Sequence, residues 1–84
     1  MKIEIKENNA CVVTVAGETY EGRVEEGRII LENFFMGGGL MMFLGENSRN
    51  WKIGETVYNS AVMGRSSIVE GRMLVPTLVF SNEG

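Results

Sequence analysis

The sequence predicts an all-β protein, a small antiparallel β-barrel or sandwich of about eight short strands. Three observations favour this class. Apolar and polar residues alternate with a period of two, turn-forming residues recur along the chain, and no segment has a clear helical period. A chain of 84 residues is too short for two separate cores, so we expect one all-β domain over residues 1–84.

The N-terminal part of the chain predicts a four-stranded meander. Ile3 and Ile5 share one face of the first strand, and Cys11, Val13 and Val15 share one face of the second. The third and fourth strands are expected at 20–25 and 28–33. Between the strands, turns are expected at 8–9, 16–18 and 26–27, where asparagine or glycine accepts a positive φ.

The apolar segment 34–44 contains Gly37, Gly38 and Gly39 in a row. Apolar residues fall on both faces of this segment, so we expect two short buried strands joined at the glycines, where backbones pack closely or bend sharply. A phosphate-binding loop is the alternative, but no Gly-Lys-Ser/Thr follows the glycines. Residues 45–50 are expected to form a polar loop.

The second half of the chain predicts further short strands. One is expected at 51–53, and 56–63 suits either a strand or a helix, of which we favour the strand. Residues 64–67 and 71–72 read as turns on either side of a strand at 68–70. The last strand is expected at 73–80, where Pro76 requires an edge position or a bulge.

The composition excludes most common types of catalytic centre. The chain has no histidine, aspartate or glutamine and one cysteine, Cys11, so a nucleophile lacks its usual base and a zinc site lacks its ligands. Cys11 is expected to be a small buried residue. The one adjacent carboxylate pair, Glu25 and Glu26, is expected at a solvated hairpin corner, although such a pair could in principle cleave a glycoside. We therefore expect no enzyme activity, no metal and no cofactor.

The net charge and the lack of targeting signals limit the partners and the location that we expect. A net charge of −3 opposes binding to long nucleic acids, but it does not prevent a few arginines from meeting a small phosphate ligand. Residues 1–9 lack the apolar run of a secretory signal, and 34–44 is shorter than the ~20 residues that span a bilayer. With a lone cysteine, a cytoplasmic location without membrane contact is expected.

Two polar segments are the candidate binding site. Residues 47–52 combine cations, hydrogen-bonding side chains and the one tryptophan, and residues 64–67 add a glycine, a cation and two hydroxyls. Cations bind phosphate, an aromatic ring stacks on a base, and polar side chains provide specificity. A polar loop whose tryptophan anchors the next strand is the alternative reading. The candidate ligand-binding residues are Asn47, Ser48, Arg49, Trp51, Lys52, Tyr58, Arg65, Ser66 and Ser67.

Two families share features with the chain. Residues 12–24 followed by 29–33 are similar to the first half of Sm-like RNA-binding barrels, although 25–27 read Glu-Glu-Gly where that family has aspartate and asparagine. In general character the chain also looks like the virus-encoded nucleotide sponges, which sequester cyclic-nucleotide signals of bacterial immunity and are small, non-catalytic and oligomeric. The residues behind that likeness are Arg49, Trp51 and the Gly-Arg-Ser-Ser stretch at 64–67.

These features lead to a functional hypothesis. We expect a viral counter-defence protein that sequesters a small anionic ligand, most simply a cyclic nucleotide, in the host cytoplasm. The alternatives are an Sm-like or other oligonucleotide-binding barrel, and a structural, virion or protein-inhibitor module. A thin core, internal methionines and the two-faced apolar segment 34–44 predict a homo-oligomer, with the ligand site across a subunit interface.

Overall fold

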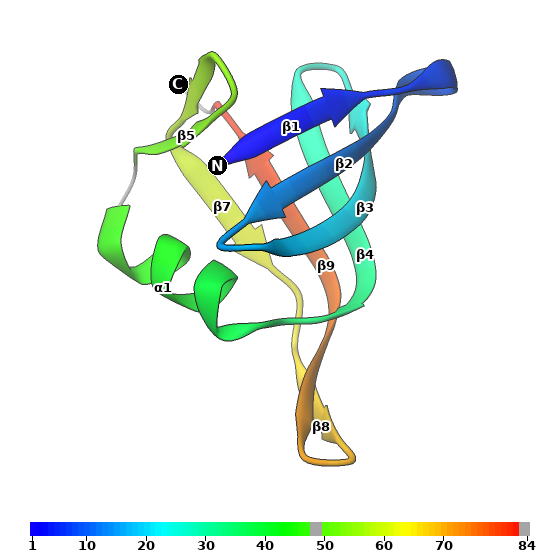
Figure 1. Ribbon diagram of the computed structural model, residues 1–84, viewed down its shortest axis with the longest axis vertical. Coiled ribbons are helices and arrows are strands. Elements are labelled where there is room, and N and C mark those ends of the chain that lie inside the picture. Colours follow the sequence, from blue (N-terminus) through cyan, green and yellow to red (C-terminus); the bar gives the residue numbers. More distant parts are fainter. Residues whose placement is uncertain (48–49, 83–84) are drawn as a thin grey trace.

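The computed structural model describes residues 1–47 and 50–82 and confirms the all-β class (Figure 1). Seven strands form one antiparallel sheet in the order β1-β2-β3-β4-β9-β7, with β8 also paired to β9, and β5 pairs with β6 in a second sheet. The elements are β1 Lys2–Ile5, a 3-10 helix Glu7–Asn9, β2 Ala10–Val15, β3 Glu18–Glu25, β4 Arg28–Phe35, α1 Gly38–Asn47, β5 Trp51–Ile53, β6 Thr56–Tyr58, β7 Ser60–Met63, β8 Ser67–Val69 and β9 Arg72–Ser81.

The expected N-terminal meander is confirmed. Strands β1 to β4 pair in sequence order, and the residues at the expected reversals have positive φ. Asn8 and Asn9 have φ values of 57° and 64°, and Ala16 and Gly17 have 50° and 78°. Two positive φ values in succession are the mark of a tight hairpin turn whose twist matches its strands. The same geometry recurs at Glu26–Gly27 and Glu70–Gly71.

The segment 34–44 differs from its prediction, because it continues β4 and then forms the helix α1 instead of two strands. The helix starts where Glu18 of β3 meets it: Oε1 of Glu18 accepts hydrogen bonds from the Tyr20 hydroxyl at 3.0 Å and from the backbone N–H of Leu40 at 3.4 Å. The backbone N–H of Gly37 donates to the Tyr20 hydroxyl oxygen at 2.9 Å. A Cβ on Gly37 would lie 1.8 Å from Oε2 of Glu18, so glycine is required for this close approach.

The expectation of strand for 56–63 is confirmed, as β6 and β7. Residues 64–67 do not form the expected turn. Instead the chain continues along β9, so that β7 pairs with β9 up to Met63↔Leu78 and β8 pairs with it again from Ser67↔Leu74. We call residues 64–75, which project from the body in Figure 1, the arm.

Pro76 lies opposite the gap between these two ladders. It is not at a sheet edge, because β9 is paired on both sides. On the other side the β4–β9 register also omits it, passing from Glu32↔Thr77 to Phe34↔Val75. Asn33 of β4, which this register also omits, has a φ of 50°. Proline has no N–H to donate, and the hydrogen-bonded pairing of β9 is interrupted on both sides at this position.

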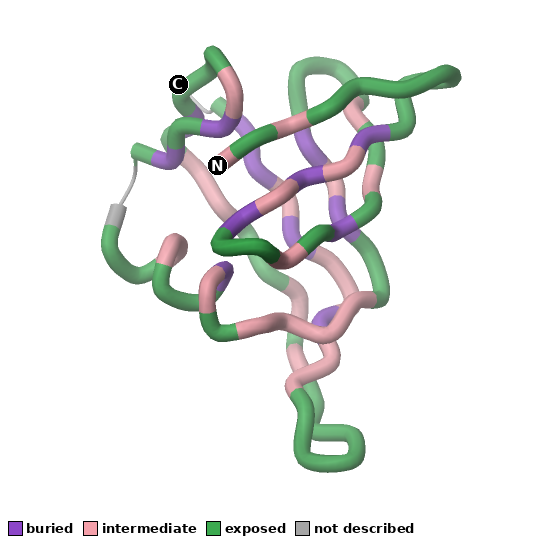
Figure 2. Tube along the Cα trace, in the orientation of Figure 1, coloured by how far each residue is buried: buried purple, intermediate pink, exposed green. Residues whose placement is uncertain are grey.

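The hydrophobic core lies between the sheet and the elements that cover it. Phe80 is at its centre, with ring contacts to Phe43, Trp51 and Tyr58 at centroid distances of 6.3–6.5 Å. Figure 2 shows buried residues along β2, β4, β9 and β5, whereas the end of the arm is exposed. Within the described residues, no helix is long and apolar enough to cross a bilayer.

Candidate functional site

The candidate residues of the first polar segment are only partly described. Asn47 ends α1, and Ser48 and Arg49 lie outside the described residues. Lys52 is exposed in the middle of β5, on the face opposite to Trp51 and Ile53, which are buried. This segment therefore leaves one described cation available to a ligand.

The two aromatic candidates belong to the core. Trp51 is 9% exposed and Tyr58 is 7% exposed, and the two are directly opposite each other in the β5–β6 ladder. Nε1 of Trp51 donates to the carbonyl oxygen of Leu44 at 3.3 Å, which ties β5 to the end of α1. Burial raises the pKa of Tyr58, and a hydrogen bond with Thr56 partly opposes that shift. The expectation that either ring stacks on a base is not met by this packing; Trp51 anchors its strand, as the alternative reading proposed.

The second polar segment lies on the arm. Arg65 and Ser67 are exposed and Ser66 is half-buried. Figure 1 shows β5 and β8 toward opposite ends of the longest axis of the molecule, so Lys52 and the serines of the arm do not line one pocket within a single chain. One cavity does adjoin the arm, and its residues were not among those expected from the sequence.

This cavity has a volume of about 420 Å³ and lies between β3 and β4. The two strands are paired only from Gly22↔Leu31 to Glu25↔Arg28. Before Gly22, β3 remains with β2, while β4 beyond Leu31 remains with β9, so the strands diverge and leave a wedge. The cavity is lined by Thr19, Tyr20, Glu21, Glu32, Asn33, Phe34, Phe35 and Arg72.

Gly22 stands where the strands diverge. A Cβ at this position would lie 2.3 Å from the carbonyl oxygen of Ile30 and 2.6 Å from a methyl group of Leu31. Only glycine allows β3 and β4 to approach so closely before they separate. The wedge therefore depends on a residue at its narrow end that has no side chain.

The aromatic side of the cavity is held in place by hydrogen bonds. The rings of Tyr20 and Phe34 meet edge to face at a centroid distance of 5.3 Å. The Tyr20 hydroxyl is fixed between Glu18 and the N–H of Gly37, and burial raises the pKa of this phenol. This side of the cavity is thus connected to the start of α1 by hydrogen bonds within the chain.

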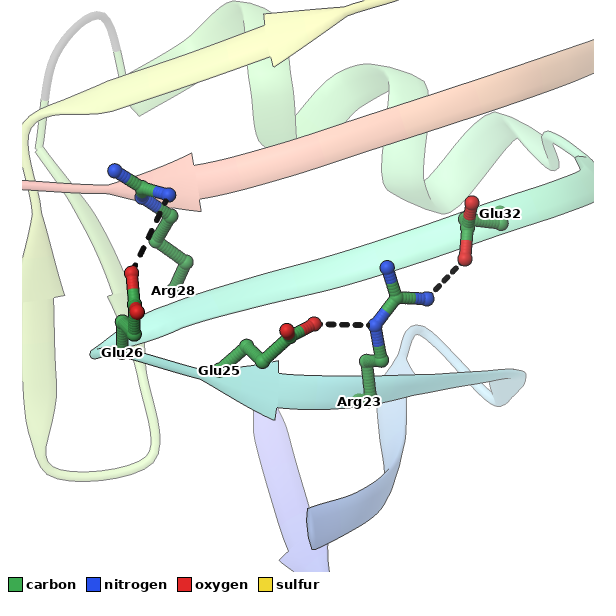
Figure 3. Close-up of polar contacts among 5 residues, drawn as sticks. All are labelled: Arg23, Glu25, Glu26, Arg28 and Glu32. Carbon is green, nitrogen blue, oxygen red and sulfur yellow. Dashed lines mark hydrogen bonds and ion pairs between the residues drawn. The ribbon is translucent and has the colours of Figure 1, made fainter.

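The charged groups of the cavity are arranged asymmetrically. Arg23, which is not a lining residue, donates from Nη1 to Oε1 of Glu32 and from Nε to Oε2 of Glu25 at 2.6 Å (Figure 3). These hydrogen bonds raise the pKa of Arg23. Glu32 is thus ion-paired, whereas the lining carboxylate of Glu21 takes part in none of the ion pairs found among the described residues.

The four described arginines fall into two pairs. Arg23 and Arg28 contact carboxylates of the meander, with Arg28 4.0 Å from Glu26 (Figure 3). Arg65 and Arg72, both on the arm, are in no ion pair with the described residues. The guanidinium carbon of Arg72 lies 4.1 Å from the centre of the Phe35 ring, a cation–π contact that leaves its hydrogen-bond donors available.

The register of the arm relates Arg72 to the expected residues. Ser67 pairs with Leu74, which pairs with Phe35 on its other side, and Val69 pairs with Arg72. Directly paired residues share a face of the sheet, and so do residues two apart in a strand. Ser67 therefore lies on the face that carries Arg72 and Phe35, and Arg65 precedes it by two positions.

The described residues contain neither a metal-binding cluster nor an exposed cysteine. No group of three or more metal-ligating side chains comes together among them. Cys11 is buried in β2, and burial raises the pKa of its thiol, so that the nucleophilic thiolate is disfavoured.

Comparison with protein-family models, with curated proteins and with solved structures finds no match.

Proposed function

We propose that the chain is a non-catalytic binding protein for a small anionic ligand, a nucleotide, which it holds at the cavity between β3 and β4. The observation that carries the proposal is Arg72. Its guanidinium lines a cavity of about 420 Å³, is positioned by Phe35 and is in no ion pair with the described residues. Typical small-molecule sites are ~300–1,000 Å³, and arginine forms two parallel hydrogen bonds to a phosphate.

The arm extends the proposed phosphate site. Ser67 shares a face with Arg72, and Arg65 precedes Ser67 by two positions, nearer the body. A diphosphate or a cyclic dinucleotide could therefore contact both guanidinium groups and the hydroxyl between them. The meander contributes no such site, because the carboxylates of Glu25, Glu26 and Glu32 occupy its arginines.

The proposed role is sequestration and not turnover. The binding residues are a guanidinium, hydroxyls and carboxylates, with no histidine to act as a base, and Cys11 is buried in the core. A protein that removes a signalling nucleotide from the cytoplasm without cleaving it would serve as a viral counter-defence protein, and we retain this as the biological part of the proposal.

The proposal includes assembly into a homo-oligomer. One edge of the main sheet is β1, in which Lys2 and Glu4 alternate with apolar residues, a pattern that discourages edge pairing. The other edge is β7 and β8, whose strands contain no charged residue and expose Val62 at 60% and Ile68 at 70%. These exposed apolar residues favour contact with a second copy, and they equally suit the alternative of a structural or protein-inhibitor module.

Calorimetric titration tests the proposed function. The panel contains cyclic dinucleotides, mononucleotides and short RNA oligomers. Arg72→Ala should weaken nucleotide binding by about 10- to 100-fold, the usual value of a charge-assisted hydrogen bond, and should leave the fold intact. Arg28→Ala, on the opposite hairpin, is the matched control and should change nothing. Equal losses from both variants would indicate a diffuse charge effect and would reject a defined site.

The same titrations separate the alternatives. One nucleotide for each protomer or each dimer is the expected stoichiometry. Affinity that grows with RNA length and falls steeply with salt would instead indicate an oligonucleotide-binding barrel. No binding to any member of the panel would reject the nucleotide proposal and leave the structural or inhibitor role. Light scattering tests assembly independently, because a 9.3 kDa monomer at high micromolar concentration would contradict it.

A further inference from the structure

We infer that the cavity between β3 and β4 selects guanine, with the carboxylate of Glu21 reading the hydrogen-bonding edge of the base. This inference rests on the proposed function, because it assigns the base of the nucleotide whose phosphate meets Arg72. It goes further by naming which of the common bases the site accepts.

The two sides of the cavity have opposite hydrogen-bonding character. The strands β3 and β4 contribute the carboxylates of Glu21 and Glu32, which can only accept, and the carboxamide of Asn33, which can accept and donate. From β9 comes Arg72, which can only donate. A nucleotide has acceptors at its phosphate and donors on its base, so the phosphate is oriented toward β9 and the base toward β3.

Glu21 is the carboxylate that is free to read a base. The other lining carboxylate, Glu32, already accepts a hydrogen bond from Nη1 of Arg23. Glu21 takes part in no ion pair or side-chain hydrogen bond found among the described residues. Glu21 is exposed at the open side of the cavity, and a carboxylate gains most from a partner that donates to both of its oxygens.

Guanine is the base that matches a carboxylate. An ionised carboxylate has two oxygens side by side and no proton to donate, so its best partner has two adjacent N–H donors. Guanine presents N1–H next to its N2 amino group on one edge. Adenine and cytosine present one amino donor beside a ring-nitrogen acceptor, and uracil presents one N–H between two carbonyls. Each of the last three bases would direct an acceptor at one carboxylate oxygen, which is repulsive.

The backbone at the same wall is also unusual. Asn33 has a φ of 50° within β4, whereas the other non-glycine residues with positive φ in the described chain lie in reversals. This conformation, opposite Pro76, separates Asn33 from the ladder and leaves it in the lining of the cavity. Asn33 and Glu21 thus line the same cavity, and the carboxamide is a second hydrogen-bonding group for the base.

Titrations with guanosine, inosine and adenosine 5′-monophosphates test the inference. Inosine has N1–H but lacks the N2 amino group, so it isolates the second hydrogen bond. The intact protein should bind the guanosine nucleotide at least about 10-fold more tightly than the adenosine nucleotide, with inosine between them. Glu21→Gln should remove this preference while changing affinity for the adenosine nucleotide little. The variant Glu55→Gln, at an exposed turn outside the cavity, should behave as the unmodified protein.

The possible failures are distinguishable. Equal binding of guanosine and adenosine nucleotides by the unmodified protein would overturn the guanine inference and leave the proposed function intact. Equal effects of Glu21→Gln and Glu55→Gln would show a general charge effect and would also overturn it. If none of the three nucleotides binds, the guanine inference is rejected, whereas the proposed function is rejected only if the cyclic dinucleotides also fail to bind. Circular dichroism of each variant confirms that a lost affinity is not lost folding.

Discussion

The carboxylate of Glu18 accepts a hydrogen bond from the backbone N–H of Leu40, 22 residues farther along the chain, at 3.4 Å. The first turn of a helix has N–H groups with no partner inside the helix, and here a residue of β3 provides one. The same oxygen accepts the Tyr20 hydroxyl bond at 3.0 Å. The start of α1 and the aromatic side of the cavity are therefore held by one carboxylate.

Gly37→Ala should destabilise the protein by about 0.5–2 kcal/mol, the usual cost of losing a helix cap. The added Cβ would lie 1.8 Å from Oε2 of Glu18, and because that carboxylate ends a flexible side chain, it would move away and release the helix. Urea unfolding measures the effect. In a Glu18→Ala background the substitution should cost little, since the cap is already absent; equal costs in both backgrounds would contradict this explanation.

Gly38→Ala is the matched control for that experiment. A Cβ at Gly38 would have no atom within 4 Å, and alanine is favoured over glycine in helices by about 1 kcal/mol. We therefore expect unchanged or slightly increased stability from this neighbouring substitution. A loss as large as that of Gly37→Ala would show that the glycine run matters for its backbone freedom and not for the approach of Glu18.

Gly22→Ala should destabilise the protein by about 2–3 kcal/mol, the upper part of the range for overpacking. Its Cβ would lie 2.3 Å from the carbonyl oxygen of Ile30, and a backbone atom within a ladder cannot move as the end of a side chain can. Gly45→Ala in α1, which would have no atom within 4 Å, is the control and should be neutral or stabilising. Chemical denaturation measures the free energy of unfolding of both variants. An unchanged value for Gly22→Ala would contradict the proposed close approach.

Trp51 should fluoresce as a shielded indole. The side chain is packed against Phe80 and donates to the carbonyl of Leu44, so iodide should quench it weakly until urea unfolds the chain. Because the sequence contains one tryptophan, the indole fluorescence comes from Trp51 alone. Nucleotides at the proposed cavity should not quench it by stacking. Strong iodide quenching of the folded protein would show that Trp51 is accessible and would restore it as a candidate for base stacking.

The free energy of unfolding should fall as the pH rises above 9. Burial raises the pKa of Cys11 above its ordinary value of 9.0, and it raises the pKa values of Tyr20 and Tyr58 above 10.0. Each group has a higher pKa in the folded state than in the unfolded state, so between these two values the folded state binds more protons. The stabilisation that each group contributes is therefore complete below its ordinary pKa and is lost as the pH rises through its folded-state pKa. Urea unfolding at a series of pH values measures this. Constant stability from about pH 8 to about pH 11 would contradict it.

The all-β class and the N-terminal meander were predictable because they depend on local signals. Alternation of apolar residues sets the faces of β2, and glycine or asparagine with positive φ sets each reversal. The helix α1 was not predictable in this way. Its residues are apolar on several sides, it contains glycines in its first turn, and its cap comes from Glu18 on a distant strand instead of from the preceding residues.

The candidate site was predicted less well than the fold. Alternation within Trp51–Lys52–Ile53 was enough to show that Trp51 shares the buried face of Ile53, although the richness of polar residues around it suggested a ligand. Arg72 was missed because Gly71-Arg72 reads as a turn, when the turn is Glu70–Gly71 and Arg72 begins β9. The cavity arises from the divergence of two strands, and Gly22 is the one local sign of it.

The break in pairing opposite Pro76 divides β9 into two parts with different resistance to opening. Toward its C-terminus, β9 is paired on both sides with β4 and β7 and carries the buried Leu78 and Phe80. Beyond the break β9 still pairs with β4 at Leu74 and Val75, and Val75 is buried, whereas the exposed tip of the arm is held by its short ladder with β8. Local opening requires only the bonds of the unit that opens, so this tip can unpair while the body remains folded. We therefore expect the backbone amides of one continuous strand to exchange their hydrogens on two timescales, faster at the tip of the arm than in the body.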